Sequence, residues 1–300
     1  MKILLLGKNG QVGWELQRSL ASLGEVTALD RHSTDFCGDL NNLAGLQDTV
    51  QRLRPDVIVN AAAHTAVDKA ESEPELARLI NATALGVLAQ EAQKLGAWLV
   101  HYSTDYVFDG SGSQPWIEDA TPAPLSVYGQ TKLEGEQLIA QQCQKYLIFR
   151  TSWVYAARGG NFAKTMLRLA RDRERLTVID DQWGAPTGAE LISDVTAHAV
   201  RQVTQSSSRQ YSEAGIYNLA ANGEASWNSY AKHVLDEARR LQPSIELLAK
   251  EVAPVPTSAF PTQAKRPHNS RLNTDKLQTT FGLFLPPWQQ GVNRMLSEIL

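Results

Sequence analysis

The chain has 300 residues, of which 43% are hydrophobic and 20% are charged, and its formal net charge at pH 7 is −3. This length suits one large α/β domain or two modest domains that share a cleft, and the composition is typical of a soluble protein. It excludes a membrane-spanning helix, because no stretch approaches the roughly 18 apolar residues that such a helix needs, and the small charge indicates no general attraction to nucleic acid or to a membrane surface.

The first predicted strand is KILLLG at residues 2–7. This apolar run is too short for the roughly 7 to 15 residues at the centre of a secretory signal peptide. Cys37 and Cys143 are the only cysteines, so the sequence indicates neither a disulfide framework nor a cysteine-rich metal site. We therefore expect a cytoplasmic protein.

Strands and helices alternate through the first half of the chain. Amphipathic helices are predicted at 11–24, 42–53 and 74–95 and in the segment that carries Tyr128, and between them lie apolar runs typical of buried strands: 2–7, 25–30, 56–63, 98–105 and 145–155. This alternation predicts an α/β fold with a doubly wound, parallel (Rossmann) sheet. We assign residues 1–155 to this dinucleotide-binding domain.

The pattern changes after residue 155. Short apolar runs alternate with helices predicted at 189–203 and 226–241, and prolines gather in VAPVPTSAFPTQAKRP. The segment QSSSRQ (205–210) is predicted as a loop. We expect residues 156–300 to form a smaller, mainly substrate-binding lobe, some segments of which can return to the main sheet.

The turn GKNGQVG (7–13) joins the first strand to the first helix. Gly7, Gly10 and Gly13 are spaced three residues apart, and Gln11 and Val12 start the helix. Glycine suits a backbone that turns tightly and approaches a pyrophosphate closely, and a helix N-terminus offers free N–H groups to a phosphate. Because the strand–turn–helix context is present, we predict a dinucleotide phosphate site rather than a plain tight turn.

Residues at the end of the second strand are candidates for the adenosine end of the cofactor. Asp30 lies about 20 residues after the glycine loop, where a carboxylate accepts hydrogen bonds from a ribose. Arg31 beside it can instead meet a 2′-phosphate, so the sequence does not choose between NADH and NADPH. Asp39 and Leu40 are candidates for contact with adenine, and an ordinary loop acid is the alternative for Asp39.

Tyr128 and Lys132 stand four residues apart at the start of the predicted helix VYGQTKLEGE, so they share one helix face. An ammonium about 4 Å away lowers the pKa of a tyrosine by at most about three units at an effective dielectric of about 20. We therefore predict that Tyr128 is a general acid or base, and that Lys132 tunes it and holds a nicotinamide ribose. Thr104, at the carboxyl end of the strand 98–105, is placed to hydrogen-bond a substrate carbonyl. The alternative is an amphipathic helix with a half-buried tyrosine and an exposed lysine.

Three other polar residues lie near the expected site. His64, in NAAAHT, lies on the expected cofactor path, although satisfied loop histidines are common. Lys265 and Arg266, in QAKRPHNS, can clamp a diphosphate, and the alternative is a solvated pair. No group of His, Cys and carboxylate residues has the spacing of metal ligands, so the sequence locates no metal site.

These motifs together resemble the extended short-chain dehydrogenase/reductase superfamily, which has a glycine loop, an acid after the second strand, an NAAA segment, a Ser or Thr at a strand end and a YxxxK pair. Within it, the sequence is similar to the dTDP-4-dehydrorhamnose reductase family. The strings that carry this resemblance are GKNGQVG, NAAAHTAVDKAE, HYSTDYVFDG, YGQTKLEGE and AKRPHNSRL. The similarity covers essentially the whole chain.

The resemblance implies a reaction and roles for particular residues. A reduced nicotinamide delivers a hydride to C4 of dTDP-4-dehydro-L-rhamnose, Tyr128 donates a proton, Lys132 supports it and Thr104 polarises the ketone. The product, dTDP-L-rhamnose, serves cell-surface polysaccharides such as the O-antigen of lipopolysaccharide. The resemblance also places further residues at the cofactor (Ala62, Ala63, His64, Thr65) and at the sugar (Asp105, Trp153). It implies a homodimer and an activity that depends on Mg²⁺.

Three alternatives share parts of this pattern. A sugar-nucleotide dehydratase would carry an Asp–Glu pair after the catalytic threonine, whereas Asp105 is followed by Tyr106. A 4-epimerase has the same motifs but keeps its cofactor through the catalytic cycle. A non-catalytic relative, the regulatory subunit of methionine adenosyltransferase, would bind a partner enzyme with little turnover, and the retained Thr104, Tyr128 and Lys132 argue against it.

Overall fold

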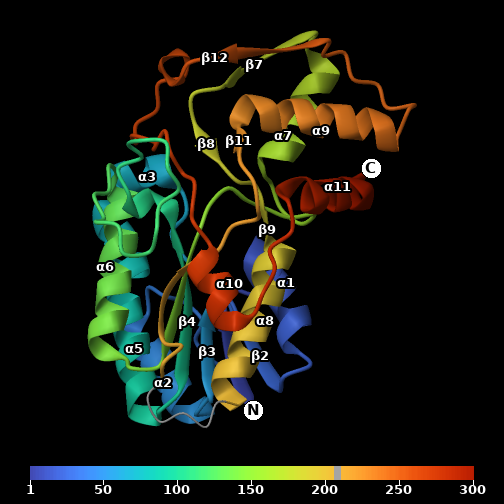
Figure 1. Ribbon diagram of the computed structural model, residues 1–300. Coiled ribbons are helices and arrows are strands. Elements are labelled where there is room, and N and C mark those ends of the chain that lie inside the picture. The colour runs from blue at the N-terminus through green and yellow to red at the C-terminus, as the bar shows by residue number, and fades with distance from the viewer. Residues whose placement is uncertain (206–210) are drawn as a thin grey trace.

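A six-stranded parallel sheet forms the centre of the molecule in the computed structural model, which describes residues 1–205 and 211–300 (Figure 1). Its strand order is β10-β5-β4-β3-β1-β2, with every neighbouring pair parallel. The strands are β1 (Lys2–Leu6), β2 (Glu25–Leu29), β3 (Val57–Asn60), β4 (Trp98–Thr104), β5 (Tyr146–Thr151) and β10 (Gly215–Asn218). The predicted doubly wound fold is confirmed. The chain order reverses between β1 and β3, the position where such sheets bind dinucleotides.

Helices cover both faces of this sheet. One face packs against α2 (Leu43–Leu53), α5 (Ala84–Leu95) and α6 (Val127–Gln142), and the other against α1 (Gln11–Leu20), α8 (Ala189–Gln205) and α10 (Asp275–Phe281). In β1, Leu4 and Leu6 lie in the first core and Ile3 and Leu5 in the second. Because both faces are buried, the strand is continuously apolar instead of alternating with polar residues.

The helix predicted at 74–95 is interrupted. It consists of α4 (Pro74–Arg78), a π-helix at Leu79–Thr83 and α5, and it follows the short α3 (Val67–Ser72). No glycine or internal proline marks the change, so the apolar periodicity could not reveal it. A π-turn inserts one extra residue into the helix and redirects the side chains of that turn, and such turns are frequent at functional sites.

The second lobe has a hydrophobic core of its own. Its helices are α7 (Phe162–Asp172), α9 (Trp227–Leu241) and α11 (Trp288–Ile299). Three short strand pairs complete it: β7 (Arg175–Ile179) with β12 (Glu251–Val255), β6 (Val154–Tyr155) with β9 (Thr187–Gly188), and β8 (Trp183–Gly184) with β11 (Ala225–Ser226). Short 3₁₀ helices occur at Asp105–Val107 and Thr257–Ala259. Figure 1 shows this lobe above the carboxyl ends of the main strands.

Parts of the second half of the sequence return to the main sheet. β10 pairs with β5 as an edge strand, and α8 and α10 cover one face of the sheet. The predicted loop QSSSRQ lies, apart from Gln205, outside the described residues. The division of function at residue 155 stays a prediction.

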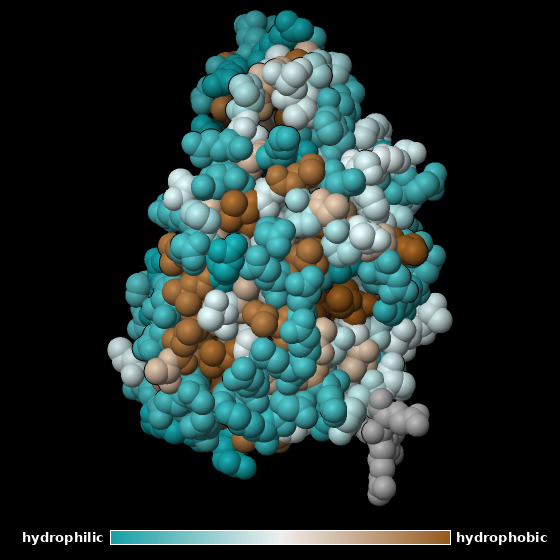
Figure 2. All heavy atoms as spheres, turned by 90° about the vertical axis from the view of Figure 1, so that its left-hand side faces the viewer, coloured by the Kyte–Doolittle hydropathy of each residue, from teal (hydrophilic) through white to brown (hydrophobic). Residues whose placement is uncertain are grey.

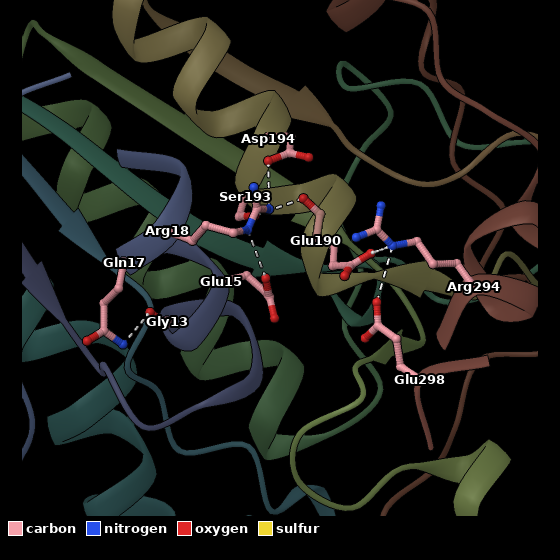
Figure 3. A network of polar contacts seen from close by, with 9 residues as sticks. All are labelled: Gly13, Glu15, Gln17, Arg18, Glu190, Ser193, Asp194, Arg294 and Glu298. Atoms are coloured by element: carbon pink, nitrogen blue, oxygen red, sulfur yellow. Dashed lines mark hydrogen bonds and ion pairs between the residues drawn. The ribbon is translucent and has the colours of Figure 1, made fainter. Parts of the chain in front are cut away.

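Exposed polar side chains link the first helix to the second lobe. Figure 3 shows two small networks along α1, α8 and α11, in which Arg18 pairs with Glu15 and Asp194, and Arg294 with Glu190 and Glu298. Each exposed pair contributes less than about 1 kcal/mol to stability. These ion pairs connect α1 to α8 and α8 to α11, three helices from distant parts of the chain. On the face that carries α5 and α6, hydrophilic residues predominate, with several hydrophobic areas between them (Figure 2).

Candidate active site

The predicted phosphate loop lies at the switch point of the sheet. Gly7 follows β1 with φ +89°, and a Cβ there would come within 2.7 Å of the Ala62 nitrogen that follows β3. At Gly13, a Cβ would overlap the Gly7 carbonyl, so close packing of helix against loop requires glycine at both positions. Gln17 holds this turn by donating to the Gly13 carbonyl, at 3.3 Å (Figure 3).

The helix start beside this loop can receive an anion. Gly10 is the N-cap of α1, and it offers no side chain to the free N–H groups of the first turn. Gln11 opens the helix and donates through its side chain to the Gly160 carbonyl at 3.5 Å, which brings the second lobe over the loop. Val12 packs against the core on the face of the sheet that α1, α8 and α10 cover. The predicted residues at 7–13 are thus brought together at one helix N-terminus, where the dipole favours a phosphate.

Acidic and basic groups meet at the end of β2. Asp30 accepts from the His32 N–H at 2.9 Å and from the Ser33 hydroxyl at 3.2 Å, and the His32 hydrogen bond lowers the pKa of this carboxyl. Arg31 is exposed beside it, and the Lys8 ammonium lies 3.5 Å from the Ser33 hydroxyl. The corner therefore carries both an acceptor for a ribose and cations for a 2′-phosphate.

The two residues predicted to contact adenine have other partners in this structure. Leu40 is buried, together with Leu29, in the core on the face of the sheet that α2, α5 and α6 cover. The Asp39 carboxylate accepts from the Asn41 N–H at 3.0 Å. Their loop nevertheless lies against the end of β2, because a Cβ on Gly38 would come within 2.6 Å of the Asp30 carbonyl.

The segment after β3 is fixed by a buried asparagine that the sequence did not reveal as functional. Asn81, in the π-helix, accepts from the His64 N–H at 2.8 Å and donates to the His64 carbonyl at 3.1 Å. It also donates to the Thr131 hydroxyl of α6 at 3.2 Å. The π-turn thereby ties the predicted cofactor segment, Ala62 to Thr65, to the helix that carries Tyr128. The His64 side chain is nearly buried, with its Nε2 3.9 Å from Glu73.

Thr104 and Tyr128 meet at the edge predicted for them. α6 begins at Val127 because the Ser126 hydroxyl accepts from the Gly129 N–H at 3.2 Å. The Tyr128 ring packs edge-on against Tyr106, with centroids 5.5 Å apart. Burial raises the pKa of Tyr128, and the neighbouring Thr104 hydroxyl acts weakly in the opposite direction. This differs from the prediction that the pKa falls, and the reason lies in the position of Lys132.

Lys132 is 1% exposed and points into the molecule. Its Nζ lies 2.6 Å from the Tyr102 carbonyl oxygen and 2.9 Å from His101 Nε2, both on β4. Lys132 therefore does not lower the pKa of Tyr128 in this structure, although the two residues share a helix face as predicted. Burial lowers the pKa of Lys132 to about 7, against the opposing effect of Glu136. His101 was missed by the sequence analysis, although a polar residue in the apolar run WLVHYST was a signal.

Asp105 is a buried acid beside Thr104. It is 2% exposed and its Oδ1 accepts from the Thr104 hydroxyl at 3.1 Å. Burial raises the pKa of this carboxyl to about 6, and Ser270 and Thr104 oppose the shift by hydrogen bonding. The next residue, Tyr106, has a pKa of about 12, raised by burial first and by Asp105 second.

The C-terminal segment that carries Lys265 and Arg266 crosses the site. Arg266 donates to Asp68 of α3 at 2.8 Å, and the Ala264 N–H donates to the same carboxylate at 3.1 Å. Lys265 is exposed. The two predicted cations thus differ from each other in this structure, because Arg266 is paired with Asp68 whereas Lys265 is exposed.

Trp153 projects from the strand end after β5 with a strained backbone. Its φ is +49°, a conformation that non-glycine residues rarely adopt, and its ring stacks on Trp227 with centroids 3.6 Å apart. A Cβ on Gly184 would come within 2.8 Å of this ring. Strain of this kind persists where the surroundings hold it, often at binding sites.

A metal site is not formed by the described part of the chain. Within residues 1–205 and 211–300, no three His, Cys, Asp or Glu side chains are grouped so that they could hold a metal ion. Four acids of α1, α8 and α11 are ion-paired with Arg18 or Arg294: Glu15, Glu190, Asp194 and Glu298. The described residues of this single chain therefore locate no Mg²⁺ site. In the same residues, no helix combines the length and the apolar character needed to cross a membrane.

The fold and the site define a class of protein. A parallel sheet with a glycine loop at its switch point, followed by a Thr and a Tyr–Lys pair at the same edge, is the arrangement of a nicotinamide-dependent oxidoreductase of the short-chain dehydrogenase/reductase type.

Comparison with known proteins narrows the class. The family model described as the RmlD substrate binding domain matches residues 1–300. The dTDP-4-dehydrorhamnose reductase of Shigella flexneri is 60% identical over 299 residues, which cover 100% of this chain and 98% of that protein. The chain belongs to the dTDP-4-dehydrorhamnose reductase family.

Solved structures agree with this assignment. A dTDP-4-dehydrorhamnose reductase from Clostridium acetobutylicum superposes with a TM-score of 0.89 at 35% identity, covering 100% of this chain and 99% of that one. The enzyme from Bacillus anthracis, in complex with NADP, gives a TM-score of 0.87 at 34% identity and covers 99% of each chain.

Proposed function

We propose that this chain reduces the C4 ketone of dTDP-4-dehydro-L-rhamnose with NAD(P)H, giving dTDP-L-rhamnose for the synthesis of cell-surface polysaccharide. One observation carries the proposal. In a chain 60% identical to such a reductase, Thr104 and Tyr128 meet at the sheet edge that also carries the phosphate loop. A ketone bound between the two hydroxyls would lie over the expected path of the nicotinamide.

The chemistry follows from the state of the two hydroxyl groups. A bound NAD(P)H supplies the hydride to C4. Because burial raises the pKa of Tyr128, its phenol keeps its proton at neutral pH and can donate it to the alkoxide that forms at C4. The Thr104 hydroxyl polarises the ketone oxygen before and during this step. A raised pKa suits an acid catalyst of a reduction, because the C4 alkoxide is a stronger base than a phenolate.

The cofactor is held along the carboxyl edge of the sheet. Residues 7–13 receive the pyrophosphate, and Asp30 and Arg31 receive the adenosine end. The segment Ala62 to Thr65 lies along the cofactor, and Asp39 and Leu40 border adenine. Lys132 binds the nicotinamide ribose once its side chain turns away from the Tyr102 carbonyl. The corner around Asp30 carries groups that suit either cofactor, so the proposal names the reductant as NADPH or NADH without choosing between them.

The sugar nucleotide lies between the lobes. Asp105 and Trp153 contact the sugar together with Thr104 and Tyr128. Lys265 and Arg266 bind the diphosphate, and for Arg266 this requires exchange of its pair with Asp68 for a phosphate. The strained Trp153 backbone, fixed by the stacked Trp227, supports a preorganised sugar site.

Several broader properties belong to the same proposal on family resemblance. They are a homodimeric state, a cytoplasmic location, a product used for the O-antigen of lipopolysaccharide, and an activity that depends on Mg²⁺. No step of the proposed mechanism is assigned to Mg²⁺.

A spectrophotometric assay tests the proposal. Purified protein is mixed with NADPH or NADH and dTDP-4-dehydro-L-rhamnose, and the absorbance of the reduced nicotinamide is followed. Substrate-dependent loss of the band supports the reductase and ranks the cofactors. Cofactor binding without loss of the band would refute it. NAD found tightly bound in the purified protein would then favour an epimerase, and its absence a regulatory protein.

A further inference from the structure

Three buried polar side chains lie behind the active site in a row. His101, in β4, is 1% exposed, Asn60, in β3, is 0% exposed, and Lys132 of α6 is 1% exposed. Asn60 and His101 are direct register partners on neighbouring parallel strands, so their side chains point to the same face of the sheet. Buried polar groups of this kind are nearly always hydrogen-bonded.

The hydrogen bonds in this row have only one consistent direction. The Ala62 N–H donates to Asn60 Oδ1 at 3.1 Å, which turns the Asn60 amide nitrogen toward His101. That nitrogen lies 3.2 Å from His101 Nδ1, and since it can only donate, Nδ1 accepts and carries no proton. The ring proton of the neutral imidazole therefore lies on Nε2.

This direction continues to Lys132. His101 Nε2 lies 2.9 Å from Lys132 Nζ, so its N–H donates to the amine. An amine accepts a hydrogen bond only when it is uncharged, and Nζ then uses its own proton to donate to the Tyr102 carbonyl at 2.6 Å. If Lys132 were an ammonium here, its N–H groups would meet the N–H of His101 Nε2, and one buried hydrogen bond would be lost.

The surroundings also act on the two ionisable side chains of the row. Burial and the neighbouring Lys132 lower the pKa of His101 well below its ordinary value, against the opposing effect of a hydrogen bond with the Asn60 backbone, and burial lowers the pKa of Lys132 to about 7. Glu136, one turn along α6, favours the charged lysine, but it is held by Arg150 of β5 at 2.7 Å. On the neighbouring strand β5, the register partner of His101 is the apolar Ile148.

We propose that His101, held in its Nε2–H tautomer by Asn60, is a positioning residue that keeps Lys132 uncharged and turned away from Tyr128 until the cofactor binds. This inference rests on the proposed function of Lys132. Protonation of Nζ removes its hydrogen bond from His101, and the ammonium is then directed to the site where it supports Tyr128 and a ribose. In this proposal, the charge of Lys132 and the direction of its side chain change together.

The tautomer is measured directly in the cofactor-free protein, without any assay of activity. Two-bond ¹H–¹⁵N correlation spectra distinguish the two imidazole tautomers, and the signals of His101 are assigned by their loss in His101→Gln. We expect the Nε2–H form, with no titration between about pH 5.5 and pH 8. An Nδ1–H ring, or titration with a pKa near 6.5, would overturn the proposal.

Asn60→Asp inverts the arrangement with almost no change of shape. The new carboxylate still accepts from the Ala62 N–H, but it also accepts from His101 Nδ1, so Nε2 becomes the acceptor and favours the ammonium of Lys132. We expect the spectrum to show the Nδ1–H tautomer. The alkaline limb of kcat/KM for NADPH, which reports the free enzyme, should move upward by about one pH unit, a tenfold change in lysine protonation.

Two further variants complete the test. Thr196→Val removes a buried hydrogen bond to the Tyr102 hydroxyl, 2.8 Å long, on the opposite face of β4, and should leave the limb in place. If Asn60→Asp fails to fold, His101→Gln is used in its place. The amide oxygen of the new side chain can accept from the ammonium of Lys132, so this variant should also move the alkaline limb upward. An unmoved limb in a folded variant refutes the proposal. If no variant reduces the sugar nucleotide, the pH dependence of NADPH affinity reports the protonation of Lys132 instead. Failure of the proposed function can then be told apart from failure of this inference.

Discussion

Replacement of Asp105 by asparagine should stabilise the cofactor-free protein, and the gain should depend on pH. The carboxyl is 2% exposed and its pKa is raised from 3.8 to about 6. Because the folded state holds the proton more tightly than the unfolded state, ionisation costs stability between these two values. Each unit corresponds to about 1.4 kcal/mol, so the full cost above pH 6 is about 3 kcal/mol.

The sign of the effect follows from the raised value. Below about pH 4 the carboxyl is protonated in both states and costs nothing, and the cost grows through the interval up to pH 6 and is then constant. Asp105→Asn removes the charge while its amide oxygen still accepts from the Thr104 hydroxyl. We therefore expect a gain of about 3 kcal/mol at pH 8 and about half of that at pH 5.

Thermal unfolding at pH 5 and pH 8 measures this gain. At this chain length 1 kcal/mol corresponds to about 2 °C, so the melting temperature should rise by about 6 °C at pH 8 and about 3 °C at pH 5. Asp109→Asn is the matched control, since hydrogen bonds from Ser111 lower the pKa of that exposed carboxyl and its loss should stabilise at neither pH. A rise in Asp105→Asn that is equal at both pH values, or larger at pH 5, would contradict the reasoning.

Three other substitutions test the site and its support. Tyr128→Phe should lower turnover by at least about 10²-fold in the absorbance assay, while NADPH binding measured by fluorescence stays near wild type, and an unchanged rate would remove this residue from the mechanism. Gly13→Ala should weaken NADPH binding at least about tenfold in a fluorescence titration, because its Cβ overlaps the loop carbonyl, whereas Gly160→Ala, with open space at the Cβ, should change it little. Glu136→Gln breaks a fully buried ion pair and should destabilise the fold by about 3–5 kcal/mol in urea unfolding, against less than about 1 kcal/mol for the exposed Glu251→Gln. If Glu136→Gln and Glu251→Gln lowered the free energy of unfolding by similar amounts, burial would not determine the cost of breaking an ion pair.

The sequence was sufficient where chemistry depends on local spacing. GKNGQVG predicted the strand, turn and helix that the structure has, because glycine spacing acts within one turn. Tyr128 and Lys132 share a helix face for the same reason. The return of β10 to the main sheet was only one of several arrangements that the pattern allowed, since a four-residue strand carries little information about its partner.

Tertiary contacts decided what the sequence could not. The direction of the Lys132 amine depends on His101 and the Tyr102 carbonyl, some 30 residues earlier in the chain. The pKa of Asp105 depends first on burial and then on a hydrogen bond from Ser270, which reaches it from the other lobe. The π-turn around Asn81 contains no helix-breaking residue, and the buried hydrogen bonds of Asn81 join segments that lie far apart in the sequence.

The path of the chain between the two lobes constrains how the protein can be divided or moved. The backbone leaves the main sheet after β5, returns with α8 and β10, leaves again through α9 and β12, and returns with α10 before ending in α11 (Figure 1). A fragment that ends at residue 155 would keep five strands but lose the helix that covers Val100 and Tyr102. Each lobe is therefore completed by sequence that follows the other, so the halves are expected to fold as a single cooperative unit. Opening and closing of the cleft would have to be shared among several crossing segments instead of a single hinge.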